Sequence, residues 1–338
     1  MSGEPGSRPG AFGSGLVRRL DALQRRHRFL GLPVAVMRKY FDDDGPRMAA
    51  LTTYYGFLSL FPVLLLATAA VTATLKSHPA LQQELLDRLV RPELQSEVEQ
   101  ALAQLPPSGV PLAVGLIGLL FAGNGGVLAA YFALNRIWAV PWRDRFGLVR
   151  QYVRAFSVML LTFLCALLAA ASALITDTFL RLPTAERGAS AVATAAAVFA
   201  TLTVAHKVLV CRPLRLGDIW VGGVIGALVV TALLRTATTV LPAMIARAGP
   251  VYGSFATVVG AFTLLYLISQ TLVLSVEVSA VIGDRLSPRS LTGSVPNAAD
   301  RRALALLGRQ QERVPGQVVT TTFAVAAEGA AEREKAHR

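Results

Sequence analysis

The sequence predicts an all-α, polytopic membrane protein with six transmembrane helices and an extracytoplasmic amphipathic helical hairpin. Hydrophobic residues make up 53% of the 338 residues and charged residues only 16%, whereas soluble domains carry about 25% charged residues. The apolar residues gather in long runs separated by short charged connections, and about 20 apolar residues suffice for one helix to cross a bilayer. We therefore expect a cytoplasmic N-terminal segment (1–46), a six-helix membrane domain (47–283) and a cytoplasmic, largely disordered tail (284–338).

The N-terminal segment is expected to contain a basic amphipathic helix over residues 16–30. Leu16, Leu20, Leu23 and Leu30 follow helical spacing and define an apolar stripe, whereas the arginines of this segment lie mostly off it. Such a helix beside a membrane span often lies on the anionic lipid head groups of the cytoplasmic surface. A helix that packs on the protein itself would show the same pattern, and both interpretations stay open.

The first span is an uncharged run of 28 residues from Met48 to Leu75. The run is too long and starts too late to be a cleaved signal peptide. Its first half carries hydroxyl side chains within two turns, at Thr52, Thr53, Tyr54, Tyr55 and Ser59, and Pro62 follows them. A helix that faces only lipid has no need of these hydroxyls, so this half marks a place to search for a site.

Five further spans follow the polar stretch 77–109. Leucines recur at helical spacing on both sides of Pro92 and predict the amphipathic hairpin. The spans are expected at 110–135, 155–180, 188–210, 218–245 and 251–282, and a short helix is expected at 297–313. The second span contains Gly-Asn-Gly-Gly at 123–126, which either weakens the helix or lets another helix approach closely.

The distribution of charge predicts the orientation of the spans. Six spans place both termini on one side, and 26 of the 33 Lys and Arg residues fall on that side, against six on the other. Cytoplasmic loops are enriched in Lys and Arg, so both termini are expected to be cytoplasmic. This topology accounts for the pI of about 10.5. No basic face with aromatic or groove-reading elements indicates nucleic acid as a partner.

Ionisable residues inside the spans are the best pointers to a site, because inserting one costs about 2.5–3.5 kcal/mol at mid-helix. Glu277 lies near the cytoplasmic end of the sixth span, level with the hydroxyl-rich half of the first span. We predict a polar vestibule formed by Thr52, Tyr55, Ser59, Asn135, Arg136 and Glu277. Asp177 and Arg235 lie at matching depth in the outer half and form a candidate intramembrane pair. In the structural alternative, these residues only fix the register of the helices, and Arg235 reaches towards the outer surface.

Several short motifs together resemble the YihY/BrkB family of bacterial inner-membrane proteins, once labelled ribonuclease BN-like. They are Ala49-Ala50-Leu51-Thr52-Thr53-Tyr54-Tyr55 and Ser59-Leu60-Phe61-Pro62 in the first span, Ala133-Leu134-Asn135-Arg136-Ile137-Trp138 at the end of the second, Pro213-Leu214 and Gly226-Ala227 around the start of the fifth, and Val251-Tyr252-Gly253-Ser254 with Glu277 in the sixth. The resemblance covers about residues 30–283 and implies a six-span fold in the bacterial inner membrane, without an established activity. The family commonly ends this span with Gly-Ala-Glu, where this chain has Ser275-Val276-Glu277, which puts a close-packing role of that glycine in doubt.

No motif indicates an enzyme, a cofactor or a metal, and ribonuclease activity is not expected. The chain shows no Ser-His-Asp constellation and no HExxH, P-loop or CxxC pattern, and the lone His206 is expected to be a satisfied interfacial histidine. The favoured hypothesis is a protein that moves or binds a small or lipidic substrate through a polar inward-side site. The alternative is a scaffold or assembly factor that binds other envelope proteins through the hairpin and the tails. A membrane enzyme is the third hypothesis.

Overall fold

The computed structural model describes residues 28–77, 109–175, 184–253, 255–290 and 296–323, and this part of the chain is helical without any β-strand. Its elements are α2 (Arg28–Asp42), α3 (Gly45–Ser77), α6 (Gly109–Ile137), the short 3-10 helix η2 (Trp142–Asp144), α7 (Leu148–Ile175), α8 (Thr184–Leu209), α9 (Leu216–Tyr252), α10 (Phe255–Gly283) and α11 (Ala298–Arg309). Five of these helices, α3, α6, α8, α9 and α10, are long and apolar enough to cross a membrane. The all-α, polytopic fold is therefore confirmed.

The helix α7 coincides with the third predicted span but is not among these five. It begins at Leu148, earlier than expected, and carries Arg150 and Arg154 in its first two turns. The count of six spans therefore stays a prediction. The predicted hairpin at 77–109 and the predicted helix at 16–30 fall almost entirely outside the described residues, and α2 follows directly at Arg28.

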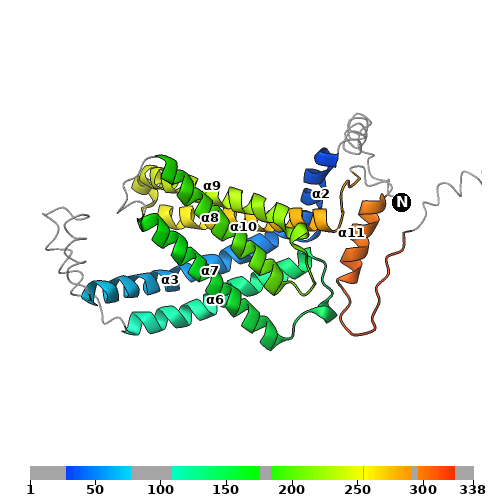
Figure 1. Ribbon diagram of the computed structural model, residues 1–338, viewed down its shortest axis with the longest axis horizontal. Coiled ribbons are helices and arrows are strands. Elements are labelled where there is room, and N and C mark those ends of the chain that lie inside the picture. Colours follow the sequence, from blue (N-terminus) through cyan, green and yellow to red (C-terminus); the bar gives the residue numbers. More distant parts are fainter. Residues whose placement is uncertain (1–27, 78–108, 176–183, 254, 291–295, 324–338) are drawn as a thin grey trace, which may run out of the picture.

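The packing contacts of the six long helices form a closed ring, and Figure 1 shows these helices from the side. Helix α3 packs along α6, and each of α6, α7, α8 and α9 packs on the next helix of the chain. The last of them, α10, packs on α3 as well as on α9, which closes the ring. Neighbours in the sequence are therefore neighbours in space, and the interior of the ring is reached by side chains from all six helices.

Glycine lets α6 approach α3 at the Gly-Asn-Gly-Gly stretch. A Cβ atom added to Gly125 would stand 2.5 Å from the ring of Tyr55, closer than two carbon atoms can approach. The helix runs without interruption from Gly109 to Ile137. Of the two interpretations of this stretch, close approach is therefore the one that holds, and Tyr55 packs against the bare backbone of α6.

A second close approach joins α9 to α10. A Cβ atom at Gly222 would lie 2.0 Å from the carbonyl oxygen of Ser275, and one at Gly226 would lie 2.8 Å from its hydroxyl oxygen. Ser275 is the position at which the YihY/BrkB resemblance leads one to expect glycine. The two helices still pack closely here, because the glycines of α9 make room for the serine of α10.

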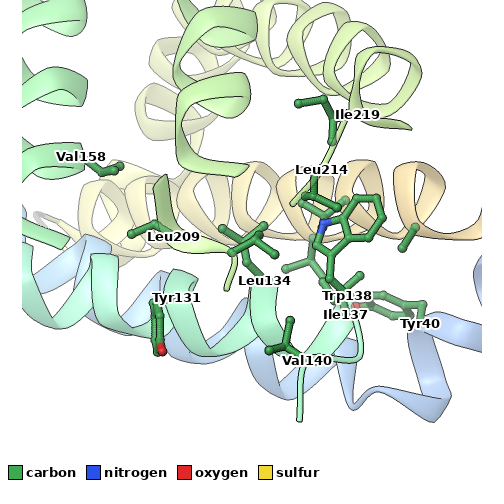
Figure 2. Close-up of a cluster of buried hydrophobic side chains, with 14 of the residues drawn as sticks. Tyr40, Tyr131, Leu134, Ile137, Trp138, Val140, Val158, Leu209, Leu214 and Ile219 are labelled. Atoms are coloured by element: carbon green, nitrogen blue, oxygen red, sulfur yellow. The ribbon is translucent and has the colours of Figure 1, made fainter. Parts of the chain in front are cut away.

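A buried apolar cluster lies at the end of the ring where α2 and α11 are found, on the right in Figure 1; we call it the α2/α11 end. Trp138, which is fully buried, lies next to Ile137 in the right half of the close-up in Figure 2, with Leu214 and Ile219 drawn above them. Ala139 follows with a φ of 52° and turns the chain away from α6. The cluster thus fixes the ends of α6, α8, α9 and α10 relative to one another.

Helix α11 is attached to this end by buried charges. Its first turn is closed by a capping box between Asn297 and Asp300. The guanidinium of Arg289 is 3% exposed, and it lies 3.0 Å from Asp300 of α11 and 2.7 Å from Asp42 of α2. One arginine therefore links both peripheral helices.

The chain beyond α10 differs from the expectation of a largely disordered tail over 284–338. Residues 284–290 and 296–323 pack against the α2/α11 end, and the predicted short helix is confirmed as Ala298–Arg309. After it, Glu312 forms an ion pair of 3.0 Å with Arg143 in the segment between α6 and α7. The segment is polar in composition and is held by ion pairs, which is why its hydropathy does not indicate order.

Candidate functional site

Glu277 is fully buried on α10 and forms an ion pair with Lys39 of α2. Its Oε2 atom lies 3.0 Å from Nζ of Lys39, although the contact lacks the geometry of a hydrogen bond. The same ammonium group donates to the carboxylate of Asp43 and, over 2.8 Å, to the carbonyl oxygen of Ile137. Lys39 therefore joins α2, α10 and the end of α6 at one point.

This cluster, which we call the Lys39 cluster (Lys39, Asp43 and Glu277), holds two acids around one base. Burial alone lowers the pKa of Lys39, but the carboxylates of Glu277 and Asp43 raise it above its ordinary value. Burial raises the pKa of Asp43, and the ammonium of Lys39 counteracts this in part. Within the described part of the chain, Oε1 of Glu277 has no hydrogen-bond partner. The cluster therefore connects α2 and α10 through buried charges.

Asn135 is buried and its amide group is fully used. Nδ2 donates to the carbonyl oxygens of Tyr131, over 2.8 Å, and of Leu209, over 2.9 Å. Oδ1 accepts from the backbone N–H of Cys211 over 2.9 Å. These bonds provide partners for backbone groups at the end of α8 and connect this end to α6.

Arg136 and Ser59 also use their polar groups within the scaffold. The guanidinium of Arg136 is partly exposed and lies 2.8 Å from the carboxylate of Asp44, in the turn between α2 and α3. The hydroxyl of Ser59 donates to the carbonyl oxygen of Gly56 over 2.7 Å, within its own helix. The second predicted site cannot be judged, because Asp177 lies outside the described residues, whereas Arg235 lies on α9.

A cavity of about 500 Å³ lies inside the ring. It starts beside Ile137 and Leu209 at the α2/α11 end, and all six long helices contribute to its wall. The wall is mainly aliphatic, and its polar side chains are Thr52, Thr162, Thr194, Thr201, Ser269 and His206. Ligand-binding cavities are commonly of this size, mostly apolar, with a few polar groups. This cavity is the candidate site.

The predicted vestibule residues therefore do not converge on one space. Of the six, Thr52 lines the cavity, whereas Tyr55, Ser59, Asn135, Arg136 and Glu277 are not part of its wall. Glu277 lies one residue beyond Val276, which does line it. The sequence predicts only how deep each side chain lies along its span. Side chains at the same depth can still point in different directions around their helix axes, so they need not face one space.

Among the described residues of the cavity wall, His206 is the ionisable side chain, and its two ring nitrogens differ. Nδ1 lies 2.7 Å from the carbonyl oxygen of Leu202. A carbonyl oxygen only accepts, so Nδ1 carries the proton and Nε2 of the neutral ring is an acceptor. Nε2 is buried and has no partner among the described residues. The expectation that His206 has hydrogen-bond partners therefore holds for Nδ1 only. The local sequence does not indicate which of the two nitrogens has a partner.

Comparison with known proteins gives one family and two relatives. The family model described as virulence factor BrkB matches residues 36–299. Inner membrane protein YhjD of Escherichia coli (strain K12) is 28% identical over 147 residues, which are 40% of this chain and 42% of that protein. An uncharacterized protein of Dickeya dadantii (strain 3937) is 33% identical over 91 residues, 26% of this chain and 28% of that protein. The matches thus span less than half of these relatives, and no solved structure matches the chain significantly.

Proposed function

This chain belongs to the family of virulence factor BrkB, and we propose that it binds a lipidic substrate in its central cavity and moves it within the membrane. The observation that carries the proposal is the cavity itself, about 500 Å³ of mainly aliphatic space lined by all six long helices, five of which are long and apolar enough to cross a membrane. An apolar chain fits such a wall, because both surfaces are removed from polar surroundings together. The location agrees with that of the E. coli relative, which is named an inner membrane protein.

The wall favours a lipidic substrate over a small ion. The hydroxyls of Thr52 and Thr162 donate to carbonyl oxygens of their own helices, over 2.9 and 2.8 Å, so they offer a ligand only their acceptor side. No Lys, Arg, Asp or Glu is among the described residues of the wall. Burying a charge without a partner is strongly unfavourable, and we infer that the substrate enters the cavity with an uncharged portion.

The predicted orientation of the protein in the membrane indicates from which leaflet the substrate enters the cavity. The cavity begins at the α2/α11 end, which the charge distribution predicts to be cytoplasmic. A lipidic substrate would therefore enter from the inner leaflet. This refines the inward-side site expected from the sequence and replaces its polar vestibule by an apolar one.

Filling the cavity tests the proposal, and two adjacent alanines of α8 provide the variant and its control. Ala197 lines the cavity, whereas Ala196 is exposed on the outer side of the same helix turn. We expect Ala197→Phe to lose the lipids that copurify with the wild-type protein and Ala196→Phe to retain them, as measured by mass spectrometry of extracted lipids. In reconstituted vesicles, movement of a fluorescent lipid between the leaflets should fall in the same variant.

Two results of these experiments would contradict the proposed function. If all three proteins carry the same lipids and move the fluorescent lipid at the same rate, the cavity is not a substrate site. If no lipid is bound or moved by any of them, the scaffold hypothesis takes precedence. Thermal unfolding of each variant in detergent shows that a loss is not due to misfolding.

A further inference from the structure

Three arginines and two aromatic rings gather where the chain passes from α6 into α7. The guanidinium carbon of Arg145 lies 3.9 Å from the centre of the Trp142 ring. That of Arg154 lies 4.0 Å from the centre of the Phe146 ring, and that of Arg150 lies 5.8 Å from the same centre. Contacts of this kind attract the cation to the face of the ring and so orient it. We call Arg145, Arg150 and Arg154 the arginine patch.

The arginine patch has no acid to balance its charge. Among the described residues, no Asp or Glu forms an ion pair with any of its three guanidinium groups. Asp144 and Glu312, which belong to the same region, pair with Arg143 instead. Arg150 and Arg154 are four residues apart on α7, and two like charges at this spacing repel each other. A bound anion would remove this repulsion.

The guanidinium groups keep donors for a ligand. Arg145 donates to the carbonyl oxygen of Val140, over 3.3 and 3.4 Å, and Arg154 donates to that of Val208 over 3.0 Å. Each guanidinium has five N–H donors, so these bonds use only part of them. The remaining nitrogens of Arg145 and Arg154 are accessible, since neither residue has a buried polar atom without a partner. Arg150 is exposed as a whole.

An exposed apolar surface borders the arginine patch. Gln151 and Ala155 are buried and face the protein, whereas the apolar side chains of the same turns are exposed, with Val149 at 80%. At 3.6 residues per turn, the exposed side chains form one continuous side of α7, and Arg150 and Arg154 adjoin it. We call this the apolar side of α7; it consists of Leu148, Val149, Tyr152, Val153 and Phe156.

Charge and apolar surface together indicate the class of ligand. A soluble anion would neutralise the arginines but would leave the apolar side of α7 in water, and an uncharged lipid would leave the arginines without a counter-charge. A phosphate group accepts two parallel hydrogen bonds from one guanidinium. The segment between α6 and α7 is predicted to be cytoplasmic from its basic residues, and the cytoplasmic leaflet contains anionic lipids.

We propose that the arginine patch and the apolar side of α7 bind an anionic phospholipid of the inner leaflet. Its phosphate lies at Arg150 and Arg154, and its acyl chains follow the apolar side of α7. This site is separate from the central cavity, to which α7 contributes Val158 and Thr162 and the arginine patch contributes nothing. It therefore does not depend on the proposed substrate.

Binding of added lipid tests the site, because detergent washes lipid from an exposed surface during purification. The purified protein is titrated with dioleoyl phosphatidylglycerol or with dioleoyl phosphatidylcholine, and the Kd of each is measured by native mass spectrometry. We expect tighter binding of phosphatidylglycerol, and we expect Arg150→Gln to weaken it by about three- to tenfold. Arg150→Lys keeps the charge and should recover part of the affinity.

Arg301→Gln is the matched control. Arg301 of α11 is also exposed and also lies over an aromatic ring, 5.7 Å from the centre of Phe323. Its replacement removes the same charge outside the site, so the Kd for phosphatidylglycerol should stay at the wild-type value. Ala197→Phe in the cavity should leave this Kd unchanged as well. Thermal unfolding in detergent checks that each variant is folded.

Four results would overturn the proposed lipid site. If Arg150→Gln and Arg301→Gln weaken binding equally, the lipid responds only to net charge. If the wild type binds both phospholipids equally, the arginines do not select an anion. If glycerol 1-phosphate displaces phosphatidylglycerol as well as the intact lipid does, the apolar side of α7 contributes nothing. If Ala197→Phe abolishes binding and Arg150→Gln does not, the lipid lies in the cavity, which supports the proposed function and contradicts this site.

Discussion

At the scale of single residues, Lys39 supplies the positive charge for two buried carboxylates from different elements. Asp43 follows it by one turn on the way to α3, and Glu277 reaches it from α10, far along the chain. A buried ion pair contributes little to folding stability compared with apolar residues of the same volume. Removing one partner is nevertheless strongly destabilising, because it leaves a buried charge without compensation. The Lys39 cluster is therefore a site where one substitution has a large effect.

We expect Lys39→Met to lower the free energy of unfolding by about 3–5 kcal/mol at neutral pH. The pKa of Lys39 is raised above its ordinary value of 10.5 in the folded protein. Its stabilising contribution is therefore complete below pH 10.5 and is lost as the pH rises through the raised value. The difference between wild type and variant, measured by chemical unfolding in detergent, should stay constant from pH 7 to pH 10 and shrink above that range.

Arg47→Met is the matched control, because its side chain is 83% exposed and lies 3.8 Å from Asp44. An exposed pair of this kind contributes at most about 1 kcal/mol. If both variants lose the same free energy of unfolding, the ion pairs of the Lys39 cluster contribute no more to stability than an exposed pair does.

How far single residues could be predicted depended on where their partners lie. Counting residues along the spans placed Glu277 level with Asn135, and the ammonium that pairs with Glu277 also binds the carbonyl oxygen of Ile137, two residues after Asn135. Lys39 was not predicted, because it belongs to a helix outside the spans whose packing on α10 has no signature in hydropathy. The unsatisfied nitrogen of His206 could not be predicted either, since it is defined by what the surrounding helices fail to supply.

At the scale of elements, small residues decide which helices pack closely. The carbonyl oxygen of Ser275 occupies the space where a side chain of Gly222 would stand. Adding even one methyl group there forces the backbones of α9 and α10 apart, because a carbonyl oxygen cannot rotate away as a side chain does. Five of the six predicted spans were predictable from hydropathy. This pairing was not, since glycine at a small-residue face indicates a close neighbour without indicating which one.

We expect Gly222→Ala to destabilise the protein by at least about 1–3 kcal/mol, the usual cost of overpacking. Gly217→Ala on the same helix is the control, since an added Cβ atom at Gly217 meets nothing within 4 Å. That variant should be neutral or gain up to about 1 kcal/mol from helix propensity. Thermal unfolding monitored by size-exclusion chromatography measures both, and a Gly222→Ala protein as stable as Gly217→Ala would contradict the close approach.

At the scale of the whole molecule, a ring of long helices is capped at one end by α2 and α11. Arg289 holds this cap, because it pairs with Asp42 at the end of α2 and with Asp300 in α11. Hydropathy predicted the ring as a set of spans. It could not predict the order of neighbours, the cavity or the cap, because these depend on contacts between segments far apart in the sequence.

We expect Arg289→Met to loosen α2 and α11 while the ring stays intact. Hydrogen exchange followed by mass spectrometry should show faster exchange of the amides in residues 28–42 and 298–309 and unchanged exchange in α6 and α10. Arg309→Met replaces an exposed arginine at the end of α11 and should leave both regions as they are. Unchanged exchange in α2 and α11 of the Arg289→Met protein would mean that apolar contacts alone hold the cap.

The closure of the ring also bears on the order in which the protein is made. The ribosome releases α2 and α3 first and α10 much later, yet α3 packs on α10 and Lys39 pairs with Glu277. During synthesis, therefore, one flank of α3 remains without its neighbour, and the ammonium of Lys39 without one of its two acids, until the sixth of the long helices has been inserted. A chain that stops before Glu277 keeps both vacancies, because neither the neighbour of α3 nor the second acid of Lys39 is then made.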